Sequence, residues 1–255
     1  MSQFDALPNE TIKALYARKS VRSFMDKPIS EESKQLIFRA AFEAPTAGNQ
    51  MLYSIIHVTD TSLKETLAQA CDHQPFIAAA PLVLIFLADT RRWLDAYRAA
   101  GLTPRKPGQG DILLAMADAV IAAQNSVVAA ESLGIGSCYI GDILEHCEHI
   151  RDILSLPEEV IPAAMLVYGY PTTQQAERKK PARFDGHYIV FENKYRLLSS
   201  DEHRKMYIDR ETRSGKAHPV FETSMEAFWK RKYESDFSRE MSRSAAIYLD
   251  TFEQR

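Results

Sequence analysis

The chain has 255 residues, of which 45% are hydrophobic and 25% charged, and its formal net charge is -3. This length can bury a substantial core in one or two domains, and the slight acidity argues against a nucleic-acid-binding protein, which usually presents a basic surface. Cys71, Cys138 and Cys147 are an odd number without a CxxC pair, which favours a reducing compartment over a disulfide framework. The first residues lack the basic region and the apolar region that a secretory signal contains. We therefore expect a cytoplasmic protein.

The N-terminal part of the chain predicts alternating helices and strands. A helix is expected from about Asn9 to Tyr16. A second starts at Ser30, whose hydroxyl suits an N-cap and is followed by two glutamates that complement the helix dipole. Pro45 ends this helix. A strand is expected at Ser54–Val58, and the pattern Ser62-x-x-Glu65 predicts a capping box at the start of the next helix.

The middle of the chain holds its most apolar segments. A strand at Leu82–Leu87 is continuously apolar, which predicts burial on both faces. Residues 101 to 110 are dense in Gly, Pro and Lys and predict a loop or lid. Asp111–Leu133 is long enough to cross a bilayer, but Asp118 interrupts it, and a mid-membrane Asp costs about 2.5 to 3.5 kcal/mol. We expect a central core helix closed by Gly134, and no membrane span.

The rest of the sequence predicts short elements. A strand at Ser137–Ile140 is followed by a helix capped through Asp142-x-x-Glu145. Further strands are expected at Ala163–Tyr168 and Tyr188–Phe191.

Neither a dinucleotide-binding fold nor a metal site is supported. Gly134-x-Gly136 follows a helix rather than a strand, and Tyr139 stands where a G-x-G-x-x-G fingerprint has its third glycine. His146 and His149 are close together, but zinc sites need further ligands at suitable spacing. The neighbouring Cys147 falls on the apolar phase of its helix, so we expect it in the core.

A basic cluster is the most informative segment. Residues 18 to 23 contain three cations and two hydroxyls, which do not suit an amphipathic helix. The guanidinium groups of Arg18 and Arg22 can bind an oxyanion bidentately, and Ser20 adds a hydroxyl donor. A solvated basic turn is the alternative explanation.

Four motifs, in order, resemble the nitroreductase family of FMN-dependent oxidoreductases. The first is R-x-S-x-R-x-F from Arg18 to Phe24, and the second is A-P-T-x-x-N-Q from Ala44 to Gln50. The third is Leu133–Gly141, and the fourth runs from Ile161-Pro162 to Tyr168-Gly169-Tyr170-Pro171. The resemblance covers about residues 10 to 197, and Glu192–Tyr195 is most similar to the NADPH-dependent branch.

This resemblance implies an α+β fold with a central, mostly antiparallel sheet flanked by helices, in an intertwined homodimer. Residues 1 to 197 would form the FMN-binding domain, and residues 198 to 255 a helical extension that packs on the same domain or on the partner subunit. In this extension, apolar residues recur every three or four positions and predict an amphipathic stripe. They are Met225, Phe228, Trp229, Tyr233 and Phe237.

By resemblance, the FMN phosphate is bound by Arg18 and Ser20, with Lys19 beside them, and by Lys180 and Arg183 from a later segment. These are the charge-assisted donors that a phosphate requires.

The flavin ring has a second group of candidates. Arg22 would stabilise negative charge at N1 and O2 of the flavin. The segment Tyr139-Ile140-Gly141-Asp142 would lie under the ring and offer a backbone N–H to N5. Asp142 either places a carboxylate near the ring or caps a helix, and its spacing from Glu145 favours the cap. Gln74 corresponds to an amide that fixes the flavin, with His73 as the alternative.

The partner subunit and the electron donor complete the implied site. The loop with Pro45, Thr46, Asn49 and Gln50 would reach the flavin bound mainly by the other subunit, although a simple turn also explains it. Arg210 and Arg213, with Lys216, are candidates for the 2'-phosphate of NADPH. A solvated surface cluster is the alternative.

The function implied is an FMN-dependent NAD(P)H oxidoreductase that works by ping-pong hydride transfer, with the flavin rather than a side chain as the reactive group. NADPH, or NADH, donates electrons, and nitroaromatics, quinones or flavins accept them. A non-catalytic flavin-binding or sensor module, or a reductive dehalogenase-type enzyme on the same fold, are the alternatives. A visible flavin spectrum and turnover of NADPH with a quinone separate these hypotheses.

Overall fold

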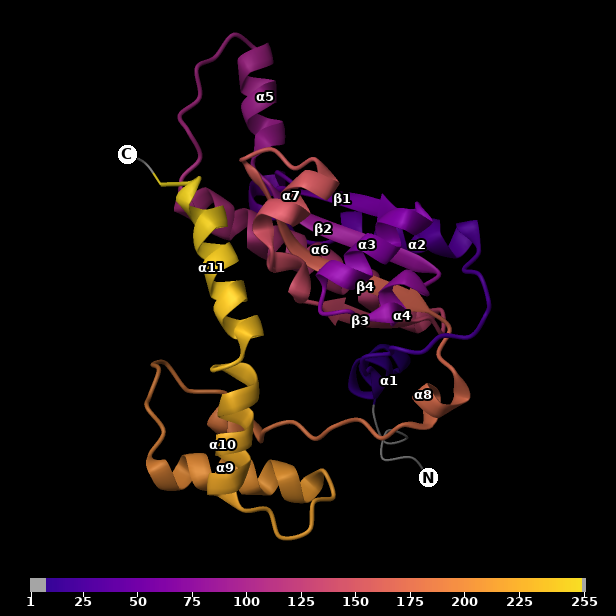
Figure 1. Ribbon diagram of the computed structural model, residues 1–255, viewed down its shortest axis with the longest axis vertical. Helices are drawn as coiled ribbons and strands as arrows, with labels where there is room; N and C mark the ends of the chain where they lie inside the picture. The colour runs from indigo at the N-terminus through magenta and orange to yellow at the C-terminus, as the bar shows by residue number, and fades with distance from the viewer. Residues whose placement is uncertain (1–7, 254–255) are drawn as a thin grey trace. The chain divides into compact units, whose positions relative to one another are not determined.

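A four-stranded antiparallel sheet is the centre of the structure, a computed structural model that describes residues 8 to 253 (Figure 1). The strand order is β1-β2-β4-β3, so β2 and β4 are central and β1 and β3 lie at the edges. The strands are β1 (Tyr53–Val58), β2 (Leu82–Asp89), β3 (Gly136–Ile140) and β4 (Val160–Gly169). The predicted α+β class and antiparallel sheet are confirmed.

Helices cover both faces of the sheet (Figure 1). On one face, α2 (Glu31–Phe42) and α6 (Gln109–Ser132) pack against Leu84 and Phe86. On the other, α3 (Thr61–Ala70), α4 (Pro75–Ala78) and α7 (Cys147–Leu154) pack against Val83 and Ile85. Every residue of β2 is buried, as predicted, because β2 has a strand on each side and helices on each face.

The predicted central helix is α6, and only part of its surface is covered. Gly134 follows its end with φ 72°, a conformation that favours glycine. By length and composition α6 alone, among the described helices, is apolar enough to cross a membrane. In this fold it packs on α2 and the sheet. Its outer side carries exposed apolar residues seven positions apart, which places them on one helix face. They are Leu113, Leu114, Val120 and Ile121.

The chain divides into two compact units. The first ends at Arg178 and takes up the chain again from Glu240, and the second is Lys179–Arg239. The remaining helices of the first unit are α1 (Glu10–Ala17), α5 (Arg91–Ala99) and α8 (Thr173–Glu177). The second unit contains α9 (Ser200–Arg213), α10 (Phe221–Lys232) and the first residues of α11 (Asp236–Asp250). The proposed division at residue 197 stays a prediction.

Two helix starts differ from the prediction. The N-cap of α3 is Asp60, whose carboxylate accepts a hydrogen bond from the Leu63 backbone N–H at 2.7 Å. Ser62 is not the cap, because its hydroxyl donates to the same carboxylate at 2.5 Å. Asp142 caps no α-helix either. A short 3-10 helix at Asp142–Leu144 leads to an extended Glu145, and α7 begins only at Cys147, which is buried as expected.

The strand predicted at Tyr188–Phe191 is wrong. Gly186–Tyr188 is a 3-10 helix, because the Asp185 carboxylate accepts a hydrogen bond from the His187 N–H at 3.2 Å and closes the backbone into a turn. The stripe predicted in the extension is also divided between two helices. Tyr233 ends α10 and is 71% exposed, and Phe237 lies in α11.

Candidate functional site

The basic segment lies along the edge strand β3. Ser20 forms a parallel bridge with Ser137, and the Val21 N–H donates to the Ser137 carbonyl at 2.9 Å. This contact requires Gly136, because a Cβ there would come within 2.5 Å of the Val21 side chain. Phe24 packs in the same way on Gly169 of β4. The first family motif, Arg18–Phe24, therefore lies beside the third and fourth motifs at β3 and β4.

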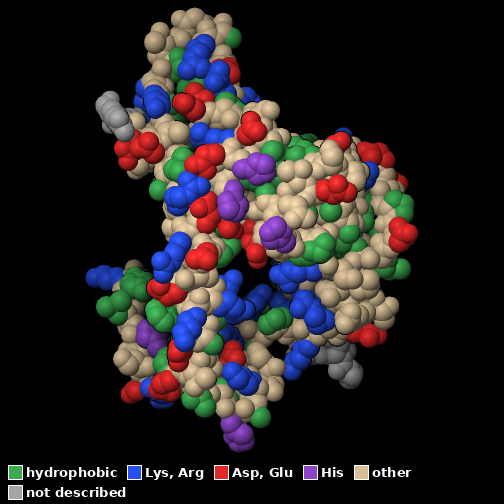
Figure 2. Space-filling model, in the orientation of Figure 1, with side chains coloured by type: hydrophobic (Ala, Val, Ile, Leu, Met, Phe, Trp, Pro, Cys, Tyr) green, Lys and Arg blue, Asp and Glu red, His purple; other side chains and the backbone are tan. Residues whose placement is uncertain are grey.

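The cations of this segment have different surroundings. The Lys19 ammonium donates to the carbonyls of Ala176 and Arg178, each at 2.5 Å, and the Arg178 guanidinium donates to the Ser20 carbonyl at 2.6 Å. Lys19 thus holds α8 against the segment, while Arg18 keeps a buried Nε without a hydrogen-bond partner among the described residues. Figure 2 shows Lys and Arg side chains gathered where α1, β3 and α8 lie.

The residues predicted to contact the flavin ring lie at the end of β3, close to the basic segment. The Arg18 guanidinium lies 6.0 Å from the centre of the Tyr139 ring. The Tyr139 hydroxyl is within 3.3 Å of Gln124 on α6, and burial raises the pKa of Tyr139 to about 12. At Gly141 the backbone is exposed, with no atom within 4 Å of where a Cβ would stand. A flat ligand can therefore approach the main chain closely here.

A buried carboxyl group that the sequence did not predict lies five residues after the end of β3. Glu145 is only 6% exposed, and its Oε1 has no hydrogen-bond partner among the described residues. Burial, reinforced by the nearby carboxylates of Asp142, Asp72 and Glu240, raises the pKa of Glu145 to about 7. No local sequence signal indicated this burial, because His146, Glu148 and His149 follow Glu145 closely, and we interpreted Glu145 as part of a helix cap.

The loop at residues 45 to 50 is held by a residue that sequence reasoning did not assign to the site. Asp118 of α6 accepts hydrogen bonds from the Thr46 hydroxyl, from the Ala47 N–H at 3.0 Å and from the Leu52 N–H at 3.2 Å. The buried carboxylate thereby fixes a loop in which Gly48 and its neighbour take positive φ values. A charged residue inside an apolar helix was the available signal.

The loop and the basic segment contact α6 at different levels. Asp118 holds the loop, and Gln124 contacts Tyr139 of β3. Because Asp118 and Gln124 are six residues apart on α6, they lie about 9 Å apart along the helix axis. The exposed Pro45 and Asn49 and the half-buried Gln50 lie in the loop. The structure therefore gathers the predicted contacts into two groups on one protomer.

The remaining candidates lie elsewhere. The Gln74 amide donates to the Cys71 carbonyl at 2.8 Å, and His73 Nδ1 is 2.6 Å from Gln69. Lys180 and Arg183 belong to the second unit, whereas Arg18 belongs to the first.

The NADPH candidates also lie in the second unit and are partly engaged. The Arg210 guanidinium lies 4.4 Å from the ring centres of both Phe184 and Tyr207 and 3.2 Å from a Glu211 oxygen. Arg213 donates to the Arg183 carbonyl at 2.9 Å. Arg210 is therefore engaged by contacts within its own unit.

Comparisons with known proteins agree with this architecture. The model of the nitroreductase family matches residues 15 to 170, and the chain belongs to that family. It is 30% identical to an FMN reductase [NAD(P)H] of Bacillus subtilis, covering 88% of this chain and 93% of the relative. It is 33% identical to an oxygen-insensitive NADPH nitroreductase of Salmonella typhimurium, covering 74% and 75%.

A solved structure extends the likeness to three dimensions. The NADPH:FMN oxidoreductase from Vibrio harveyi, complexed with NAD+, has a TM-score of 0.73 at 26% identity, covering 95% of this chain and 97% of the other. The chain is therefore an oxidoreductase of the nitroreductase type, as its motifs predict.

Proposed function

We propose that the protein binds FMN at the end of β3 and uses it to pass electrons from NAD(P)H to small aromatic acceptors. The observation that carries this proposal is a buried Arg18 Nε that has no hydrogen-bond partner within residues 8 to 253, together with an open backbone at Gly141. An anion and a flat ring are the two features that such a site accommodates together. Bound FMN would supply the hydride-transfer chemistry between the nicotinamide and the acceptor.

The chain's own residues would bind and orient the cofactor. Arg18 and Ser20 hold the phosphate, and Lys19 keeps their segment against α8. Arg22 is exposed at the same edge and supplies positive charge for the pyrimidine side of the ring. Gly141 would let the ring approach the main chain closely, and Tyr139 would contribute to holding the ring.

A homodimer completes this proposal. Leu113, Leu114, Val120 and Ile121 form an exposed apolar face on α6, and such a face favours burial against another molecule. Asp118, which holds the loop at residues 45 to 50, belongs to the same helix. Packing α6 against its copy would present this loop to the partner's flavin.

NADPH is proposed as the preferred donor. Arg210, held between two rings, can direct its unstacked edge to the 2'-phosphate. Replacing Arg210 by Ala should lower the preference for NADPH over NADH roughly tenfold, by the loss of one charge-assisted contact. Arg231→Ala is the matched control, because Arg231 also stacks on a ring, that of Phe228, at 5.3 Å. An unchanged preference in Arg210→Ala would remove this residue from the donor site.

A cytoplasmic location is part of the proposal, since the three cysteines are all free and buried. Free thiols persist where the compartment is reducing.

The decisive experiment is cofactor release. The purified protein should be yellow, should release FMN on denaturation, and should oxidise NADPH when a quinone is added. Arg18→Ala should weaken FMN binding about ten- to a hundredfold, as expected for a lost charge-assisted phosphate contact, whereas the exposed Arg39→Ala should not. A protein that takes up no FMN contradicts the proposal, and one that binds FMN without turnover favours the sensor alternative.

A further inference from the structure

We infer that a cavity beneath α5 binds a neutral aromatic molecule of one or two rings, of the quinone or nitroaromatic class. The cavity lies within the first unit, between α5, the segment 102–108 and the start of α6. α5 and this segment extend from the rest of the unit (Figure 1). The choice of ligand rests on the proposed function, while the cavity itself does not depend on FMN.

The walls of the cavity are suited to a flat ring. Its volume is about 260 Å³, below the range of pockets for drug-sized ligands, which begins near 300 Å³. Trp93 and Tyr97, one turn apart on α5, have ring centres 5.8 Å apart at an angle of 43°. Pro104 and Pro107 line it from the connecting segment, and Leu94 also lines it. Aromatic rings and prolines offer rigid apolar surface, which stacks on a planar ligand at little entropic cost.

One of the two aromatic side chains is held by a hydrogen bond, whereas Tyr97 is 36% exposed. The Trp93 indole N–H donates to the Gln50 carbonyl at 2.9 Å, so this ring is held against the loop predicted to reach the flavin. A ligand bound in the cavity would therefore lie next to that loop. No electron transfer is assigned to the cavity itself.

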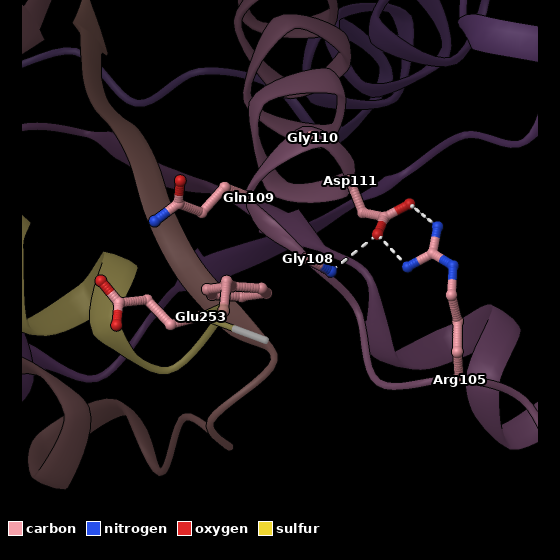
Figure 3. Close-up of a pocket in the computed structure, with 7 residues that line it drawn as sticks. Arg105, Gly108, Gln109, Gly110, Asp111 and Glu253 are labelled. Atoms are coloured by element: carbon pink, nitrogen blue, oxygen red, sulfur yellow. Dashed lines mark hydrogen bonds and ion pairs between the residues drawn. The ribbon is translucent and has the colours of Figure 1, made fainter. Parts of the chain in front are cut away.

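Charge at the rim favours a neutral ligand. Arg105 binds the Asp111 carboxylate through two nitrogens, at 2.6 and 2.9 Å, and the same carboxylate accepts from the Gly108 N–H at 2.7 Å (Figure 3). This pair leaves no uncompensated charge to attract an ion. The Tyr97 hydroxyl makes no hydrogen bond to any described residue, so it can donate to a carbonyl or nitro oxygen.

A neighbouring hollow does not share these properties. It has a volume of about 510 Å³ and is lined largely by glycine and polar residues, including Gln109 and Glu253 (Figure 3). Its charged pair is the same Arg105–Asp111 bridge. Because it offers no pair of aromatic walls, it supports no comparable ligand.

Tryptophan fluorescence tests the inference directly. The chain has only two tryptophans, Trp93 and Trp229, so a Trp229→Phe protein reports on Trp93 alone. Added 2-methyl-1,4-naphthoquinone, without NADPH, should quench this emission saturably in the protein as purified and after removal of any FMN. Tyr97→Ala should weaken binding at least tenfold. Leu102→Ala, in the same segment but exposed outside the cavity, should leave binding unchanged.

The outcomes separate this inference from the proposed function. Saturable quenching in a protein that never takes up FMN would support the cavity and contradict the flavin assignment. Linear, non-saturating quenching, or equal binding by Tyr97→Ala, would overturn the cavity even if the protein is a flavoenzyme. Loss of quenching only in the dimer would mean that the partner subunit fills the cavity, which also overturns the inference.

Discussion

Replacing Glu145 by Gln should stabilise the protein at alkaline pH and leave it nearly unchanged at acid pH. The carboxyl is 6% exposed, and one of its oxygens has no hydrogen-bond partner in the described part of the chain. The charged groups that raise its pKa are carboxylates: Asp142, Asp72 after α3 and Glu240 on α11. Ionisation therefore costs desolvation and repulsion together. Gln keeps the size and shape of the neutral acid and removes the ionisation.

The sign and size of this effect follow from the pKa. Folding raises the pKa of Glu145 from 4.5 to about 7, so the unfolded chain releases its proton first. The stability that the neutral carboxyl contributes is fully present below pH 4.5 and is lost as pH rises through 7. A shift of this size corresponds to about 3 kcal/mol at pH 8. Glu145→Gln should recover most of that amount.

Urea unfolding at pH 5 and pH 8, at constant ionic strength, measures the prediction. The difference in unfolding free energy between Glu145→Gln and wild type should grow by about 2 to 3 kcal/mol between these pH values. Glu158→Gln is the control, because Glu158 is an exposed glutamate of the same unit. A gap of the same size at both pH values would show that Glu145 is ionised throughout, and the burial argument would fail.

Two further substitutions test the packing of the site. Gly169→Ala should destabilise the protein by about 1 to 3 kcal/mol in thermal unfolding, because the new Cβ would stand 2.6 Å from the Phe24 ring; Gly110→Ala, with no atom within 4 Å, should be neutral or slightly stabilising. Asp118→Ala should lower the free energy of unfolding by about 1 to 3 kcal/mol for each N–H left unpaired. It should also make the loop around Thr46 susceptible to proteolysis. A loop that stays protected would contradict the anchoring role of Asp118.

Most of the sheet could be predicted because its signals are local. The apolar run of β2 and the helix cap at Ser30 depend on neighbouring residues, and both are found as expected. The errors arose where two local signals competed. Asp60 and Ser62 are both good caps, and only the backbone geometry decides that Asp60 accepts the N–H. At Glu145 the capping pattern was outweighed by packing, since Cys147 needs an inward-facing position.

The candidate site was less predictable than the fold, because its key contacts are distant in sequence. Asp118 was noticed as a residue that makes a membrane span unfavourable. Its hydrogen bonds reach Thr46 and Ala47, more than 70 residues earlier, and no local pattern announces them. The family motifs located the loop and the basic segment, but motifs do not say which side chain outside them holds each in place.

Helix α6 connects these observations. One side of it packs on the sheet, Asp118 positions the loop, and Gln124 contacts Tyr139 at the end of β3. Its outer side is apolar and exposed at Val120 and Ile121. A helix buried within one subunit would need no such side, and a helix exposed to water would not retain it. The same residues that make α6 seem suited to a membrane therefore fit the proposed dimer, in which this side of α6 would be buried against another subunit.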